Sequence, residues 1–137
     1  MTSGLVVDAS VSAAWLLADE ATPYTESALQ ATAEREVWVP ALWLLEMGNL
    51  LLSAQRRKRI DAAKRRELVV AASALHVRID REPVAMPDLD DLAASHGLSA
   101  YDAAYLELAL RRSAPMATLD AAMRKALKAA GVALAQF

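Results

Sequence analysis

The chain contains no cysteine and only two histidines among its 137 residues. Without cysteine it can form neither a disulfide framework nor a zinc–thiolate site, and a reducing cytoplasm is the expected location. Aromatic residues make up only 5% of the chain. No apolar run approaches the roughly 18 residues that a membrane-spanning helix needs. No basic leader precedes the first apolar run at residues 5–7, so we expect no signal peptide.

Hydrophobic side chains, in contrast, make up 55% of the chain, which excludes an intrinsically disordered protein. A length of 137 residues suits one hydrophobic core, so we expect a single domain over residues 1–137. The formal net charge is −2, from 15 basic and 17 acidic residues, whereas nucleic-acid-binding domains are usually basic. If four of the acids hold a cation, however, the other residues carry +2, so the net charge decides nothing.

Short apolar runs alternate with longer segments of helical periodicity along the chain. Strands are expected at residues 5–8, 37–39, 76–80 and 116–119, with an edge strand at 132–137. Helices are expected at residues 10–18, from 23 onwards, and at 41–58, 61–75, 89–96, 99–112 and 120–130. Ser10 or Ser12 is expected to cap the first helix and Thr22, before Pro23, the second, while Pro87 is expected in a loop. The alternation predicts an α/β fold with a central, mostly parallel sheet of four or five strands flanked by helices on both faces.

Four acidic residues on four elements can converge where such a fold gathers functional side chains, outside the carboxyl ends of its strands. Asp8 and Asp120 each follow an apolar run of strand length, Glu46 lies among apolar residues of a helix, and Asp102 lies in the first turn of another helix. Each also has an ordinary structural interpretation. Asp8 can end a strand, Asp120 can be a helix N-cap, and Asp102 has capping-box spacing from Ser99. Glu46 can face solvent or form a salt bridge.

Carboxylates that converge at one sheet edge repel one another and raise one another's pKa unless a cation neutralises them. A set of oxygen ligands, without cysteine or paired histidines, favours Mg²⁺ or Mn²⁺. Such ions bind phosphate oxygens and activate water for attack on phosphorus. If the acids converge, the sequence therefore predicts phosphodiester hydrolysis.

The segments around the four acids resemble four motifs of the PIN domain. Residues 6–10 (Val-Val-Asp-Ala-Ser) are similar to its opening strand, and residues 40–51, with Asn49 three positions after Glu46, to its second acidic motif. Residues 98–106 resemble the third motif, and residues 117–120 resemble the fourth, which pairs a hydroxyl with an acid. Order, spacing and total length agree, so the resemblance covers essentially the whole chain. The short VapC-type toxins are the most similar subgroup.

This resemblance implies an Mg²⁺- or Mn²⁺-dependent endoribonuclease that acts as the toxin of a toxin–antitoxin pair. It also implies a homodimer and inhibition by a cognate VapB-like antitoxin. By motif match, the implied catalytic, metal-binding acids are Asp8, Glu46, Asp102 and Asp120. The implied supporting residues are Ser10, Asn49 and Thr118, with the two hydroxyls orienting Asp8 and a bound water.

Basic and apolar segments suggest where RNA and protein partners bind. A basic cluster that is a candidate RNA-binding segment, or else a solvated surface, consists of Arg56, Arg57, Lys58 and Arg59. The apolar residues 38–52 are expected to be buried between copies of the chain or beneath an antitoxin helix. The three tryptophans, Trp15, Trp38 and Trp43, are expected to pack rather than to stack on bases.

Two other functions remain open from the sequence. A phosphorelay receiver has a similar length, with an aspartate after the first strand (here Asp8) and another after the third (here Asp80). Receivers, however, typically have an adjacent acidic pair after the first strand and a lysine after the last strand. This chain has neither feature. A catalytically silent PIN module that acts only as a binding partner is the other alternative, although all four acids are present. Divalent-metal-dependent cleavage of RNA distinguishes these functions.

Overall fold

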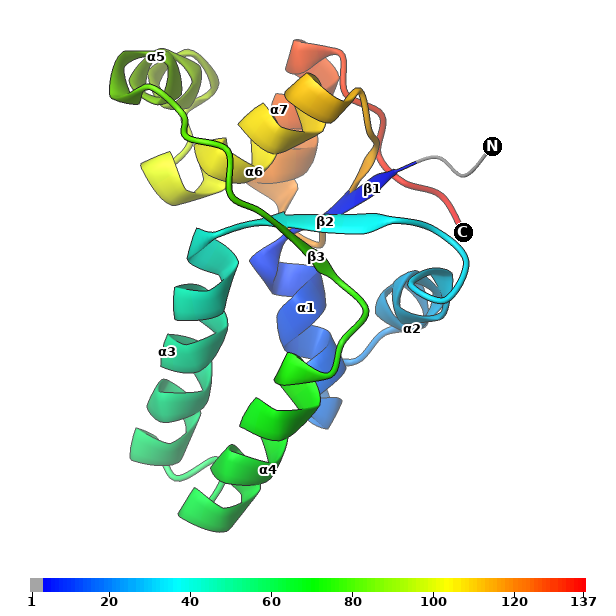
Figure 1. Cartoon of the computed structure of the whole chain (residues 1–137), viewed down its shortest axis with the longest axis vertical. Helices are drawn as coiled ribbons and strands as arrows, with labels where there is room; N and C mark the ends of the chain where they lie inside the picture. Colours follow the sequence, from blue (N-terminus) through cyan, green and yellow to red (C-terminus); the bar gives the residue numbers. More distant parts are fainter. Residues whose placement is uncertain (1–3) are drawn as a thin grey trace.

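The computed structural model describes residues 4–137, which contain a four-stranded sheet at their centre (Figure 1). The strands lie in the order β3-β2-β1-β4, and every pairing is parallel. Their bounds are β1 (Leu5–Val7), β2 (Val37–Pro40), β3 (Arg78–Asp80) and β4 (Met116–Ala117). In place of the predicted edge strand at 132–137, a single parallel bridge joins Leu134 to Met116.

Helices cover both faces of this sheet, which confirms the predicted α/β fold. Their bounds are α1 (Ala9–Leu16), η1, a short 3₁₀ helix (Ala18–Glu20), α2 (Pro23–Ala31), α3 (Leu42–Arg56), α4 (Ala62–Ser73), α5 (Met86–His96), α6 (Ala100–Arg112) and α7 (Ala121–Ala130). In Figure 1, α1 to α4 lie on one side of the strands and α5 to α7 on the other. None of the helices in residues 4–137 is long and apolar enough to cross a membrane.

The strand order explains this distribution of helices. The chain moves outward from β1 to β2 to β3, so right-handed crossovers place α1 to α4 on the same face. The return from β3 to β4 reverses the direction and places α5 and α6 on the opposite face. The order therefore reverses between β1 and β4, which is where such sheets bind ligands. Receivers have the order 2-1-3-4-5, in which β1 adjoins β3, so the observed order excludes that fold.

Side chains of β1 form the centre of the core. Leu5, Val6 and Val7 are completely buried because helices pack against both faces of this central strand. From α3, Trp43 and Met47 pack into the same core, four residues apart on one helix face. Each such side chain contributes roughly 1.5–3 kcal/mol relative to an exposed one. The core thereby fixes the residues that immediately follow β1.

Two local predictions were wrong and one is confirmed. Asp8 caps α1, in place of Ser10 or Ser12, because its extended backbone lets Oδ1 accept a hydrogen bond from the Val11 N–H at 3.2 Å. Thr22 caps α2 as predicted, with a proline in the first turn. Pro87 lies in the first turn of α5 and not in a loop, since the first turn requires no donor from its backbone nitrogen.

Ser12 links Asp8 to the hydrophobic core. Its hydroxyl is fully buried and donates to the Asp8 backbone carbonyl at 3.0 Å. The same oxygen accepts a hydrogen bond from Trp43 Nε1 at 3.0 Å. This pair of bonds connects the start of α1 to α3, and so ties the backbone of Asp8 to the helix that carries Glu46.

Candidate active site at the carboxyl edge of the sheet

Asp8 lies directly after β1, next to the point where the strand order reverses. Its backbone N–H donates to the Ala117 carbonyl of β4 at 3.2 Å, and the residue is only 4% exposed. Oδ1 accepts hydrogen bonds from Ser10 Oγ at 2.6 Å and from the Val11 N–H at 3.2 Å. Oδ2 accepts one from Thr118 Oγ1. These bonds hold the carboxylate in one orientation and leave Oδ2 with a free lone pair.

The two hydroxyls that contact Asp8 are themselves oriented by backbone amides. Ser10 Oγ accepts from the Leu119 N–H, and Thr118 Oγ1 accepts from the Asp120 N–H, each at 3.0 Å. Because the amides occupy acceptor positions, each hydroxyl has its proton free to donate to Asp8. The orientation of Asp8 by these hydroxyls, which the resemblance implied, is present in the structure.

Glu46 extends from α3 and is held by a residue that the sequence did not identify. The hydroxyl of Tyr105, on α6, donates to Glu46 Oε1 at 2.6 Å. Burial raises the pKa of Glu46, and the charges of Asp102 and Asp8 raise it further, while the tyrosine hydrogen bond opposes them. The pKa of Tyr105 is raised as well, first by burial and then by Glu46, so its hydroxyl stays protonated and remains a donor.

Asp102 and Asp120 lie at the starts of two helices, α6 and α7. The Asp102 N–H donates to the Ser99 hydroxyl at 3.1 Å, and Asp120 caps α7 by accepting from the Met123 N–H at 2.7 Å. Asp120 is thus the N-cap that its ordinary interpretation predicts, whereas at α6 only the Ser99 half of a capping box is present. Burial raises the pKa of Asp102 and the charge of Asp120 raises it further, while a hydrogen bond with the Ser99 side chain opposes them.

The four acids form one electrostatic neighbourhood. The pKa of Asp8 is raised, and burial is the largest cause. The hydrogen bonds from the two hydroxyls lower this pKa, and the charge of Asp102 raises it. None of the ion pairs shown among residues 4–137 includes any of the four acids, although those ion pairs engage six other carboxylates. None of the four acids therefore has a salt-bridge partner among the described residues.

The donors at this edge fit a hard divalent cation. They are carboxylate oxygens, and Asp8 Oδ2 and Glu46 Oε2 have lone pairs that no described hydrogen bond fills. Within the described part of the chain, no three acidic or histidine side chains are already close enough to hold one ion. Mg²⁺ needs no such cage, because it keeps several waters and binds through one or two carboxylates. The oxygen donors and their free lone pairs therefore suit Mg²⁺ or Mn²⁺.

Arg124, which the sequence did not single out, fixes the loop after β4. Its Nε and Nη2 both donate to the Thr118 carbonyl, at 3.0 and 2.8 Å. The guanidinium also lies 5.4 Å from the centre of the Tyr24 ring. This bidentate contact holds the backbone of the residue whose hydroxyl orients Asp8. Asn49, in contrast, is exposed on α3, in the turn after Glu46.

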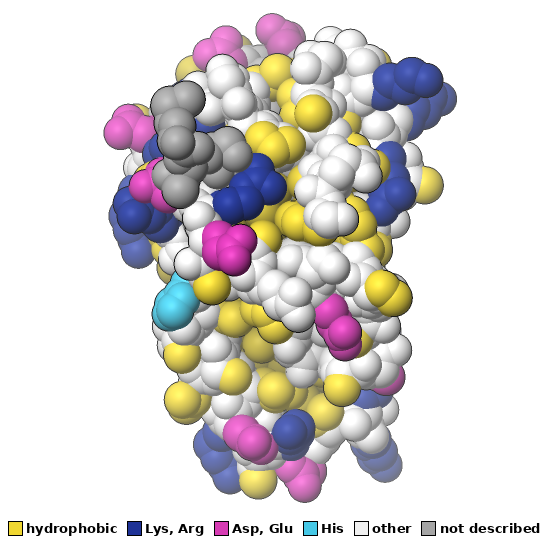
Figure 2. Space-filling model, turned by 90° about the vertical axis from the view of Figure 1, so that its right-hand side faces the viewer, with side chains coloured by type: hydrophobic (Ala, Val, Ile, Leu, Met, Phe, Trp, Pro, Cys, Tyr) yellow, Lys and Arg dark blue, Asp and Glu magenta, His cyan; other side chains and the backbone are white. Residues whose placement is uncertain are grey.

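The basic cluster lies away from the acids. Arg56 ends α3, ten residues after Glu46, which places it about 15 Å further along the helix axis. Arg59 pairs with Asp19 at 2.9 Å and with Glu20 at 3.0 Å, and these partners raise the pKa of its guanidinium. The face at the amino ends of the strands carries charges of both signs intermixed (Figure 2). The basic cluster is therefore not part of the acidic site.

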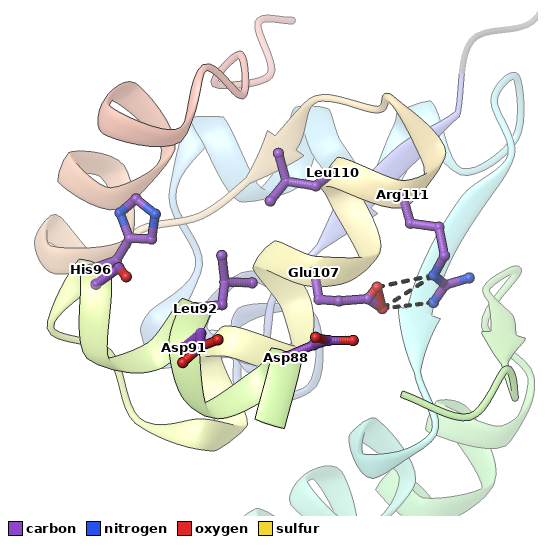
Figure 3. Close-up of a pocket in the computed structure, with 8 residues that line it drawn as sticks. Asp88, Asp91, Leu92, His96, Glu107, Leu110 and Arg111 are labelled. Atoms are coloured by element: carbon purple, nitrogen blue, oxygen red, sulfur yellow. Dashed lines mark hydrogen bonds and ion pairs between the residues drawn. The ribbon is translucent and has the colours of Figure 1, made fainter. Parts of the chain in front are cut away.

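Two further groups of acids stand apart from the Asp8 site. Asp88 and Asp91 line an open hollow of about 530 Å³ between α5 and α6, where Glu107 is already paired with Arg111 (Figure 3). Asp80 is buried at the end of β3, and its carboxylate pairs with Arg111 and Arg112 at 2.9 and 3.0 Å. Hydrogen bonds from Arg111 lower the pKa of Asp80 to about 2. Its oxygens are thus engaged with guanidinium groups.

Comparison with known proteins supports this description. The fold is similar to the crystal structure of PAE2754 from Pyrobaculum aerophilum, with a TM-score of 0.67 and 19% sequence identity. The match covers 90% of this chain and 84% of that chain, and at this identity it concerns the fold alone. None of the curated proteins matches the sequence. The PIN domain model matches residues 5–128, a span that includes all four acids, and the chain therefore belongs to the PIN domain family, whose members are commonly nucleases.

Proposed function

We propose that the chain is an Mg²⁺- or Mn²⁺-dependent endoribonuclease that hydrolyses RNA at the carboxyl edge of its sheet. The observation that carries this proposal is the environment of the Asp8 carboxylate. Its carboxylate is buried and locked by two hydroxyls, and Glu46 and Asp102 add like charge without a basic partner. Such an arrangement costs free energy in the metal-free protein, and a bound cation reverses the sign of that cost.

The protein's own groups have distinct tasks in this function. Ser10 and Thr118 hold Asp8, with Oδ2 available as a ligand, and Tyr105 holds Glu46. A bound divalent cation supplies charge neutralisation at the phosphate and lowers the pKa of an attacking water. Glu46, with its free Oε2, would be a further oxygen ligand for that cation.

The biological setting that we propose is the toxin half of a toxin–antitoxin pair, acting as a cytoplasmic homodimer that a VapB-like antitoxin inhibits. The motif resemblance supports this proposal, and so does the surface of α3. Leu44, Leu45 and Leu52 are large apolar side chains exposed on this one helix. Exposed apolar residues along one helix are typical of a surface that a second copy or a partner helix covers.

Cleavage of RNA by the purified protein tests the enzymatic proposal. Mg²⁺ or Mn²⁺ should support internal cleavage, and chelator should stop it. Asp8→Asn, Glu46→Gln and Asp102→Asn should each remove most of the activity while the circular dichroism spectrum stays native. Asp91→Asn, an exposed acid in the hollow between α5 and α6, is the matched control and should cleave like the wild type. Full activity in Asp8→Asn, or a folded wild type that binds RNA and never cleaves it, would refute the proposal.

A further inference from the structure

Tyr101 is the most exposed aromatic side chain in the described chain, at 67%. None of the three tryptophans offers a comparably free ring. Trp43 is buried, Trp15 donates its Nε1 to the Thr25 carbonyl at 2.8 Å, and Trp38 lies under the Arg112 guanidinium, 3.3 Å from its ring centre. Tyr101 makes no hydrogen bond or ring contact with residues 4–137, so its ring and its hydroxyl both face solvent.

The position of Tyr101 on α6 places it beside the acids. Residues four apart on a helix share one face, and Tyr101 precedes Tyr105 by four positions. Tyr105 reaches across to Glu46 on α3, so Tyr101 continues the same row towards solvent, one residue before Asp102. On the opposite helix, the residue before Glu46 is Leu45, which is 77% exposed. An uncharged, exposed ring therefore borders the acidic site.

The charge of the site explains why such a ring is useful. The acids repel the phosphates of an RNA chain, and the basic cluster lies about 15 Å away along α3. A divalent cation at the acids would attract the phosphate that it contacts, whereas the neighbouring base needs a contact of another kind. An aromatic ring attracts the face of any base, and this contact needs no positive charge. A base can offer its face only when it is unstacked, as in a single strand or a loop.

We propose that Tyr101 is a base-stacking subsite that binds an unpaired base of single-stranded RNA next to the scissile phosphate. This inference rests on the proposed ribonuclease function and adds a residue that binds the substrate next to the cleaved bond. A protein that covered the ring would also desolvate the neighbouring carboxylates of Asp102 and Glu46, unless it supplied them with a basic side chain. A flexible RNA strand leaves them in contact with water and cations.

Steady-state cleavage of a short single-stranded RNA with Mn²⁺ tests this subsite. Tyr101→Ala should raise KM about tenfold with kcat changed less than about twofold, because stacking contributes to binding and not to the chemical step. Tyr101→Phe and Tyr101→Trp keep a stacking ring and should retain wild-type KM. Val70→Ala removes a side chain of matching exposure (69%) on α4 and is the control.

An abasic scan of the RNA identifies the contact itself. At the stacked position, the abasic substitution should raise KM for the wild type and have no further effect on Tyr101→Ala, as coupled partners do. Additive losses at every position, or a KM in Tyr101→Phe as high as in Tyr101→Ala, would overturn the inference. So would a Tyr101→Ala variant that light scattering shows to have lost a dimer and whose KM recovers at high protein concentration. Wild type that cleaves no RNA refutes both proposals, whereas active wild type with unchanged KM in Tyr101→Ala refutes only the subsite.

Discussion

Replacing Thr118 by valine removes one hydroxyl from the centre of the site and keeps the shape of a fully buried side chain. That hydroxyl donates to Asp8 Oδ2 and accepts from the Asp120 N–H at 3.0 Å. The Asp120 N–H can donate to water instead, because Asp120 is exposed. The buried Asp8 carboxylate cannot replace its lost hydrogen bond in this way. A hydrogen bond to a charged group contributes roughly 1.5–3 kcal/mol. We therefore expect Thr118→Val to lower the free energy of unfolding by about 2 kcal/mol and Tm by roughly 5–8 °C.

Urea unfolding of the metal-free protein, followed by circular dichroism, measures this loss. Thr118→Ser keeps the hydroxyl and should recover most of the lost hydrogen-bond energy, apart from the cost of one deleted methyl group. The slope of the unfolding transition should stay constant, since the variants expose the same surface. If valine is as stable as the wild type, or if serine is no better than valine, then the hydroxyl does not support Asp8.

Two other variants test contacts that join distant parts of the chain. Asp80 has its pKa lowered from 3.8 to about 2, so its pairing with Arg111 and Arg112 adds stability that is present above pH 3.8 and lost as the pH falls towards 2. At 1.36 kcal/mol per pKa unit, Asp80→Asn should cost about 2 kcal/mol near neutral pH, and a pH-independent cost in urea titrations would contradict this origin. Tyr105→Phe removes the hydroxyl that lowers the pKa of Glu46, so that pKa should rise and the acidic limb of the pH profile of kcat should move to higher pH. An unmoved profile would show that Tyr105 does not act through Glu46.

Local patterns predicted the elements and the positions of Asp8 and Asp120 after two neighbouring strands. The apolar run before Asp8 and the proline after Thr22 mark a strand and a helix start, and the structure has both. Parallel strands bring their carboxyl ends to one edge, which is why Asp8 and Asp120 lie near each other's loops. These predictions rest on neighbours in sequence and on one general property of parallel sheets, so they needed no knowledge of the tertiary contacts.

The contacts that hold the acids in place were not predictable in the same way. Tyr105 donates to a glutamate 59 positions away, and no periodicity indicates which polar side chain a buried tyrosine will meet. The first cap was also ambiguous, because Asp8, Ser10 and Ser12 are all good capping residues within one turn. Ser12 does not cap the helix. Its hydroxyl instead accepts a hydrogen bond from Trp43 Nε1, which is a long-range contact.

Calorimetric titration of the metal-free protein with Mn²⁺ alone examines the metal site without any substrate. If Asp8, Glu46 and Asp102 share a cation, the wild type should bind Mn²⁺ saturably. Asp8→Asn should bind at least about tenfold more weakly, as expected for loss of a direct ligand, and Asp91→Asn should bind like the wild type. Because ligands with raised pKa values must lose protons to bind, the measured heat at mildly acidic pH should depend on the buffer. No saturable binding by the wild type, or equal affinity in Asp8→Asn, would contradict a metal site at this edge of the sheet.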